Sequence, residues 1–334
     1  MSTLVRAASL THYVEIARQL GLDPWRLVRD AGLPSDVLHN PDLRVAVEPV
    51  RWLLERSAEL SGEQAFALLM AEGRRVSNLG VLGMLMREEP TVRHALQSIT
   101  SYGRTHNQAL VHRIEESQGI ATVVDELHMG HPGQARQAIE LVVGVAIKAM
   151  RYFLGADWRP RRVCFMHTAP TDTAVHTRVL GLCPEFGMGF NGFVCTSAEL
   201  DTPIASADPV VAHYIRQQVQ NGFQEHTRVS DEVRHMALLL LPRGRCTIDQ
   251  VARLMNTNRR TLHRHLAAEG SVFSQLVLEV RCDLVSRYLS DTQRPLGETA
   301  ELLGFADLSS FSRWYRQHFG VVASARTKPS RPPV

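Results

Sequence analysis

The end of the chain contains an internal repeat, and this repeat limits the possible folds more than any other feature of the sequence. Residues 251–256 match residues 299–304 in their order of small, hydrophobic and polar side chains. The first match has a separation of 48 residues, and later positions keep a separation of 49 or 50, pairing Leu262 with Phe311, Arg264 with Arg313, Leu266 with Tyr315 and Gly270 with Gly320. A fixed period of this length predicts two copies of one supersecondary unit.

Each copy is predicted to form a helix, a tight turn and a second helix of about ten residues. Asn256 and Gly304 stand at the turns, and both residue types tolerate the positive φ that a sharp corner requires. Asn258 and Asp307 follow at positions where a short polar side chain caps a helix. The pattern therefore predicts two helix-turn-helix units.

The second helix of each unit has its large apolar residues four apart, on the face that packs against the first helix. The outward residues at its start suit DNA, because this part of such a helix enters the major groove. Arginine bonds guanine bidentately there, and hydroxyl groups contact phosphate. The predicted DNA-binding residues are Arg259, Arg260, Thr261, His263 and Arg264 in the first unit and Ser309, Ser310, Ser312, Arg313 and Arg316 in the second.

A stiff helix is predicted between the two units, because seven apolar residues share one helical face: Phe273, Leu276, Val277, Val280, Leu284, Val285 and Tyr288. Two DNA-contacting helices on one rigid connector can occupy successive major-groove segments about 34 Å apart. One chain would then contact a bipartite site in promoter DNA.

The charge distribution agrees with a nucleic-acid partner for this region alone. The whole chain of 334 residues has a formal net charge of only +3. From Arg243 onward there are 14 Lys and Arg against 8 Asp and Glu, whereas the preceding part has 23 against 26. A basic segment on a mildly acidic body is typical of a chain with a polyanionic partner.

The C-terminal motifs closely resemble the signature of AraC/XylS-type transcription regulators. The resemblance lies in residues 295–305 (PLGETAELLGF), residues 309–313 (SSFSR) and the pair Phe319 and Gly320, with residues 261–270 resembling the family's first recognition helix. It implies a DNA-binding domain with two helix-turn-helix units, and most often activation through RNA polymerase. Two positions depart from the family pattern, Ala323 and Arg326.

The N-terminal part is predicted to be an α+β domain of helices and an antiparallel sheet. Apolar residues recur near the 3.6 period from Leu4 to Leu20, which predicts a helix at the start. Residues 110–114 and 120–124 predict a hairpin, residues 134–154 a long helix, and residues 162–167 and 192–196 further strands. Positions around residues 167–209 resemble the effector-sensing domain of the AraC subgroup that includes ornithine-utilisation and virulence regulators, which implies a small-molecule effector.

The predicted fold is an α+β sensor domain followed by an all-α double helix-turn-helix domain. Residues 1–215 are assigned to effector sensing and dimerisation, residues 216–235 to a polar linker and residues 236–328 to DNA binding. The two helix-turn-helix units are placed at about 248–270 and 296–320.

Several other classes of protein are disfavoured. The five cysteines are odd in number and widely spaced, without a C-x-x-C pair, so no disulfide framework or zinc finger is expected. The pairs His128/His131 and His263/His265 lack a third ligand, and the G-x-G-x-x-G run at Gly187 does not open a helix. We expect no metal, no cofactor, no signal peptide and no membrane span, and a cytoplasmic location.

The sequence thus predicts an effector-responsive transcription regulator and not an enzyme, since it contains no catalytic motif. Its expected partners are promoter double-stranded DNA, RNA polymerase, a small molecule and a second copy of the chain. Two alternatives remain open at this stage. One is a constitutive DNA-binding regulator whose N-terminal domain only dimerises, and the other is an enzyme with a DNA-binding tail.

Overall fold

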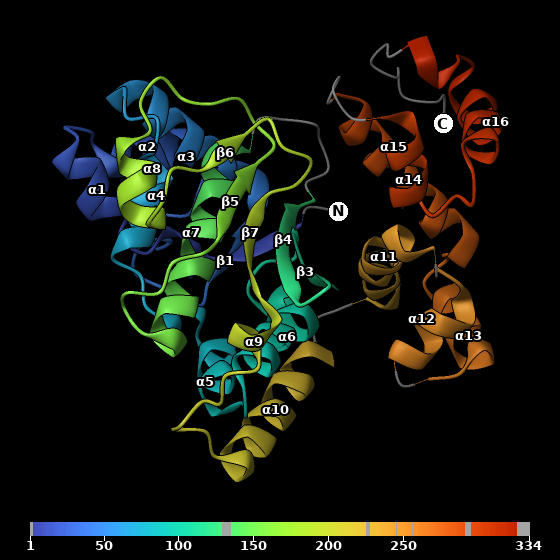
Figure 1. Cartoon of the computed structure of the whole chain (residues 1–334), viewed down its shortest axis with the longest axis horizontal. Helices are drawn as coiled ribbons and strands as arrows, with labels where there is room; N and C mark the ends of the chain where they lie inside the picture. Colours follow the sequence, from blue (N-terminus) through green and yellow to red (C-terminus); the bar gives the residue numbers. More distant parts are fainter. Residues whose placement is uncertain are drawn as a thin grey trace. The chain divides into compact units, whose positions relative to one another are not determined.

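The computed structural model describes residues 3–128, 135–224, 228–244, 246–255, 257–290 and 295–325. The chain divides into two compact units, Met1–Gln224 and Glu225–Val334 (Figure 1). The segment 216–235, expected to be a linker, is helical in most of its described residues: α10 (Pro209–Gln224) continues through its first part and α11 (Val229–Leu240) begins in its second. The sequence does not indicate that α10 extends into this segment, because the segment is polar. Helix α10 packs against α5 (Val81–Glu88) and buries only Ala212 and Val219 among its described residues.

A five-stranded sheet forms the centre of the N-terminal unit, in the order β3-β4-β7-β5-β6. The predicted hairpin is confirmed as β3 (Leu110–Ser117) and β4 (Ile120–Leu127), and the predicted strands as β5 (Arg162–Phe165) and β7 (Gly192–Thr196). The short strand β6 (Glu185–Phe186) is an addition to the predicted strands, and it pairs with β5 in parallel, so the sheet is mixed. The glycine-rich run after β6 leads into β7, as a turn between strands.

The start of the chain differs from the predicted helix. Residues Leu4–Arg6 form β1, which pairs with β2 (Arg44–Ala46), and a 3-10 turn η1 (Ala7–Leu10) follows before α1 (Tyr13–Gln19). The backbone N–H groups of Leu4 and Arg6 donate to Gln108 and His106, about a hundred residues away. These tertiary hydrogen bonds override the local helical periodicity.

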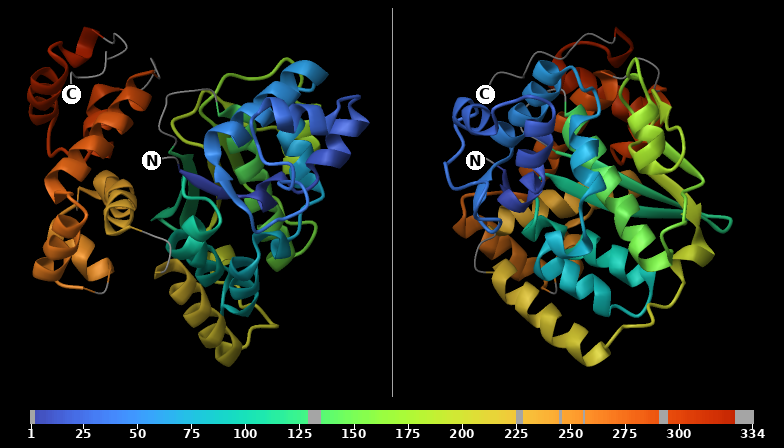
Figure 2. Two further views of the ribbon diagram at one scale, coloured as in Figure 1. Left: turned by 180° about the vertical axis from the view of Figure 1, so that it is seen from behind. Right: turned by 90° about the vertical axis from the view of Figure 1, so that its left-hand side faces the viewer.

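The remaining helices of the N-terminal unit pack beside the sheet and against one another (Figure 2). Three of them begin at side-chain caps, Asp23 for α2, Thr91 for α6 and Thr196 for α9, as local sequence signals dictate. They are α2 (Pro24–Asp30), α3 (Val47–Ser61), α4 (Phe66–Glu72), α6 (Val92–Tyr102), α7 (Arg136–Leu154), α8 (Ala174–Leu180) and α9 (Ser197–Leu200), with the 3-10 turns η2 (Val76–Leu79) and η3 (Gly103–Thr105).

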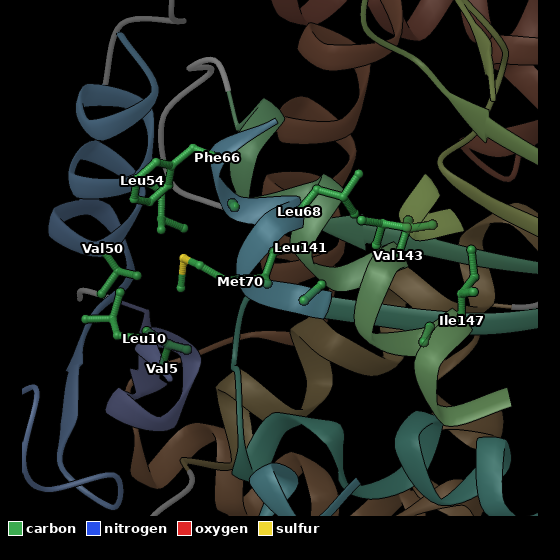
Figure 3. Packing of buried hydrophobic residues seen from close by; sticks show 14 of the residues in the cluster. Val5, Leu10, Val50, Leu54, Phe66, Leu68, Met70, Leu141, Val143 and Ile147 are labelled. Atoms are coloured by element: carbon green, nitrogen blue, oxygen red, sulfur yellow. The ribbon is translucent and has the colours of Figure 1, made fainter. Parts of the chain in front are cut away.

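Helix α7 is the centre of the hydrophobic core, because it packs against both α4 and the sheet. Its approach to α4 is close: a Cβ atom at Gly144 would lie 2.7 Å from Leu68 and 2.8 Å from Ala71. Figure 3 shows the resulting cluster, with Leu54 from α3, Leu68 from α4 and Val143 from α7. The core of the N-terminal unit thus joins segments from the beginning and the middle of the chain.

The C-terminal unit is all helical in its described residues, as predicted. Its elements are α11, η4 (Leu241–Arg243), α12 (Ile248–Leu254), α13 (Arg259–Ala268), α14 (Phe273–Ser290), α15 (Leu296–Leu302), α16 (Leu308–Phe319) and η5 (Ala323–Ala325). One hydrophobic cluster lies around α12 and α13 and another around α15 and α16, and α14 contributes residues to both. None of the helices in the described part of the chain is both long and apolar enough to cross a membrane.

Candidate DNA-binding interface and N-terminal cavity

The first helix-turn-helix unit is formed by α12 and α13, and each helix has a side-chain cap. The Thr247 hydroxyl accepts a hydrogen bond from the Gln250 N–H at 3.3 Å, and the Asn258 amide oxygen accepts one from the Thr261 N–H at 2.9 Å. Leu262 and Leu266 are buried against α12, as predicted. Asn256, the predicted turn residue, lies outside the described residues.

The outward face of α13 is basic. The side chains of Arg259, Arg260, His263 and Arg264 are exposed, and Thr261 is half-buried. Arg259 lies 3.8 Å from the Asp249 carboxylate on α12, but both side chains are more than half exposed, so solvent screens this pair. The predicted set from the first unit is therefore brought together on one accessible helix.

The second unit is formed by α15 and α16, and its corner depends on Gly304. This residue has a φ of 73°, and a Cβ atom there would lie 2.9 Å from the Leu241 carbonyl oxygen. Asp307 caps α16 by accepting hydrogen bonds from the Ser310 N–H at 2.7 Å and the Ser310 hydroxyl at 2.9 Å. These bonds hold the pKa of Asp307 below its ordinary value. The corner and the cap both agree with the sequence prediction.

The exposed face of α16 carries Ser309, Ser312, Arg313 and Arg316. Ser310 is also exposed, but its hydroxyl donates to Asp307, which gives it a capping role beyond the DNA contact predicted for it. Phe311 and Tyr315 occupy the opposite, buried face. The side chains predicted to face DNA and those predicted to form the core are thus separated as expected.

Helix α14 holds the two helix-turn-helix units at its opposite ends. Figures 1 and 2 show α13 and α16 along the same edge of the C-terminal unit. Of the seven apolar residues predicted on its inner face, six are buried: Leu276, Val277, Val280, Leu284, Val285 and Tyr288. Arg281 ties α14 to the second unit, because its Nε donates to the Leu303 carbonyl at 3.1 Å and its guanidinium lies 4.8 Å from the Phe305 ring centroid. The spacing of the two exposed faces is therefore fixed by packing.

A second site lies within the N-terminal unit, as a cavity of about 110 Å³ between α7 and the β3–β4 hairpin. One wall is a single stripe of α7, and the hairpin supplies alternate residues from the facing side of the sheet. Val5, Val50, Leu54 and Leu141, labelled in Figure 3, belong to its apolar lining. The wall residues from α7 are Ala138, Leu141, Val142, Val145, Ala146 and Ala149.

One end of this cavity is electropositive. Arg74 is only 5% exposed, and its Nη2 donates to the carbonyl oxygens of Ser9 and Thr11. Burial lowers the pKa of Arg74 to about 10. Burial, together with the charges of Arg6, Arg74 and Arg44, lowers the pKa of His106 to about 3, so this imidazole is neutral at pH 7.

The hairpin places a buried pair in the wall of the same cavity. The Nδ1 atom of His112 on β3 lies 2.7 Å from the Asp125 carboxylate on β4, and each side chain is 1% exposed. The Nε2 atom of His112 and the Oδ2 atom of Asp125 have no hydrogen-bond partner among the described residues. Nothing in the sequence marks these residues as a site, because β3 and β4 contain no unusual motif.

Comparison with known proteins supports this two-part arrangement. Residues 21–204 match the model for the arabinose-binding domain of the AraC transcription regulator, and residues 251–328 match a helix-turn-helix domain. The chain belongs to the AraC family of DNA-binding transcription regulators. Family membership places it among regulators of transcription and not among enzymes.

Two relatives of this AraC-family chain match it over nearly their whole length. The HTH-type transcriptional regulator VirS of Mycobacterium tuberculosis is 28% identical over 324 residues, covering 96% of this chain and 95% of VirS. The ornithine utilization regulator of Pseudomonas aeruginosa is 27% identical over 332 residues, with the same coverage. The crystal structure of the transcriptional regulator CdpR from Pseudomonas aeruginosa aligns with a TM-score of 0.43 at 23% identity, covering 90% of this chain and 96% of CdpR.

The remaining sequence predictions can be placed in the AraC-family structure. Ala323, one of the two departures from the family pattern, is buried beside α16, whereas Arg326 lies outside the described residues, as does His131. The described residues contain no group of three or more side chains suited to a metal ion. The cavity beside Arg74 and the bond between the Ser310 hydroxyl and Asp307 are the features that sequence reasoning missed.

Proposed function

We propose that this regulator responds to a small-molecule effector and activates transcription by contacting two successive major-groove segments of promoter DNA. The observation that carries the proposal is the pair of exposed, basic helix faces on α13 and α16 at the two ends of α14. The N-terminal unit would bind the effector and a second copy of the chain. RNA polymerase would be its partner in the cytoplasm, where the promoter lies.

The proposed DNA contacts are made by the starts of α13 and α16. Arg260 and Arg264 in the first unit and Arg313 in the second would bond guanine edges or phosphates, because an arginine fork matches both geometries. The hydroxyls of Ser309 and Ser312 would contact phosphate. Arg259, Thr261, His263, Ser310 and Arg316 complete the proposed set, with Ser310 acting through its cap on α16.

A DNA titration tests this assignment. We expect Arg264→Ala and Arg313→Ala each to weaken specific binding by roughly 5- to 150-fold, which corresponds to the loss of one bidentate contact. Fluorescence anisotropy with a duplex selected from a random-sequence pool by the wild-type protein measures the effect. Arg29→Ala removes the same charge from an exposed position on α2 in the other unit and serves as the matched control. Wild-type affinity in both test variants would refute the recognition-helix assignment.

The effector response is the second part of the proposal. A ligand changes the output only if it binds one of two conformations more tightly. The cavity beside α7 favours a sensor over a unit that only dimerises, because it offers apolar lining together with buried polar atoms. Metabolites that bind the N-terminal unit should therefore change the DNA affinity of the full chain, whereas a constitutive regulator would show no change.

A further inference from the structure

The cavity between α7 and the β3–β4 hairpin contains buried polar atoms that the protein itself leaves without hydrogen-bond partners. Within the described residues, four such atoms belong to side chains that line it: Ser9 Oγ, Arg74 Nε, His112 Nε2 and Asp125 Oδ2. A buried polar atom without a partner is unfavourable, because it has lost its hydrogen bonds to water and gained none in return. A set of four in one cavity therefore indicates a site that a polar group of a ligand completes.

Arg74 sets the charge of that ligand. Its hydrogen bonds among the described residues go to two carbonyl oxygens, and no described carboxylate lies within ion-pair distance of it. Arg51, which also lines the cavity, differs because its Nε donates to Glu48 at 2.8 Å. A buried guanidinium without a counter-charge is costly, and a ligand anion would remove that cost.

We propose that this cavity binds a small organic acid, whose carboxylate pairs with Arg74 and whose hydrophobic body lies between α7 and the β3–β4 hairpin. This assignment rests on the proposed effector response and gives it a site and a class of ligand. The unpartnered Nε of Arg74 can donate a charge-assisted hydrogen bond to a carboxylate, and a neutral head group would form only a weaker bond there.

The apolar lining determines the polarity and the size of the rest of the ligand. Leu141, Val142 and Val145 form part of the α7 wall, and Leu110 and Leu127 face them from the hairpin. The volume of about 110 Å³ is similar in scale to a cavity of about 150 Å³ that holds benzene, so the body contains about six carbon atoms.

The His112–Asp125 pair provides a second polar contact. The Nδ1 atom of His112 lies 2.7 Å from Oδ1 of Asp125, so that oxygen already has a hydrogen-bond partner. Its unpartnered Oδ2 atom accepts a hydrogen bond, which favours an acid that carries a hydroxyl group on its body. The acid is therefore held at two points, by the attraction between its carboxylate and Arg74 and by a hydrogen bond from its hydroxyl group to Asp125.

A thermal-shift experiment with matched ligands tests the carboxylate requirement on the full chain without DNA. The probes are butyrate, hexanoate, octanoate, benzoate and mandelate at pH 7, each compared with its primary amide. At ten times the dissociation constant, a bound acid should raise the midpoint of the N-terminal unit by about 3–6 °C. The amides should give a much smaller shift. The proposal is overturned if no acid gives a shift, or if acids and amides give equal shifts.

Two variants test the location. Val142→Phe fills the cavity from α7 and should abolish the shift, whereas Val81→Phe makes the same change at an exposed position on α5 outside the lining and should retain it. Arg74→Gln keeps a donor for the carbonyls of Ser9 and Thr11 but removes the charge, so it should abolish the difference between acid and amide. If Arg74→Gln does not fold, the Val142→Phe comparison still decides. An acid shift retained in Val142→Phe would overturn the proposed location.

Failure here is distinguishable from failure of the proposed function. DNA binding by α13 and α16 is measured separately, with Arg264→Ala and Arg313→Ala. If those variants lose affinity and no acid binds, the regulator assignment stands and the ligand assignment is wrong.

Discussion

Glu140 on α7 shows how a single buried residue depends on its surroundings. Its side chain has no exposed surface, and its Oε1 atom lies 3.0 Å from Arg136 Nε, 3.2 Å from His167 Nε2 and 3.1 Å from His176 Nε2. Burial alone would raise the pKa of Glu140, but the two histidines and Arg136 outweigh it and lower the pKa to about 2. The ionised carboxylate therefore stabilises the N-terminal unit.

We predict that Glu140→Gln lowers the free energy of unfolding of the N-terminal unit by about 3 kcal/mol at pH 7. The folded-state pKa lies below the ordinary value of 4.5, so the contribution is complete above pH 4.5 and is lost as the pH falls toward 2. Urea denaturation followed by circular dichroism between pH 7 and pH 3.5 measures the difference from wild type.

The control for this prediction is Glu59→Gln, which removes a carboxylate that is 65% exposed and paired with Arg56. It should change the free energy of unfolding by less than about 0.5 kcal/mol. A loss in Glu140→Gln that is equally small, or that grows as the pH falls from 4.5, would contradict this account of the buried carboxylate.

At the scale of elements, the corner between α15 and α16 gives a direct test of backbone geometry. Gly304→Ala places a Cβ atom in the left-handed region and 2.9 Å from the Leu241 carbonyl, so both conformational strain and a backbone clash oppose it. We predict a loss of about 2 kcal/mol or more in the second helix-turn-helix unit. Amide hydrogen exchange in α15 and α16 measures this loss.

Gly270→Ala is the matched control, because Gly270 has a φ of 66° and a Cβ atom placed there would have no neighbour within 4 Å. It should cost only the conformational term of about 1 kcal/mol. Equal losses at the two positions would show that the contact with η4 does not constrain the corner.

The elements that could be predicted from the sequence are those specified by local signals. The caps at Asn258 and Asp307 and the hairpin strand β4 depend on neighbouring residues, and the structure confirms them. Strands β1 and β6 are only three and two residues long, so they depend on distant partners. The end of α10 falls within the predicted linker because its burial against α5 is a tertiary contact that the local sequence does not report.

At the scale of the whole molecule, the two sites differ in how far the sequence specifies them. The proposed DNA-facing residues lie on two short helices with a repeated pattern, so the sequence alone is enough to predict them. The cavity draws on Arg74 after α4, His112 on β3 and Val142 on α7, which are far apart in the chain. No local pattern indicates that these residues meet, since packing brings them together.

The central claim is that one chain contacts two successive major-groove segments at a spacing fixed by α14, and selection of duplexes from a random-sequence pool tests it most directly. The bound duplexes should share two motifs whose centres are separated by about 10 base pairs, one helical turn. Arg264→Ala should relax only one motif and Arg313→Ala only the other. A single motif, a variable spacing between motifs, or loss of both motifs from either substitution would contradict the account.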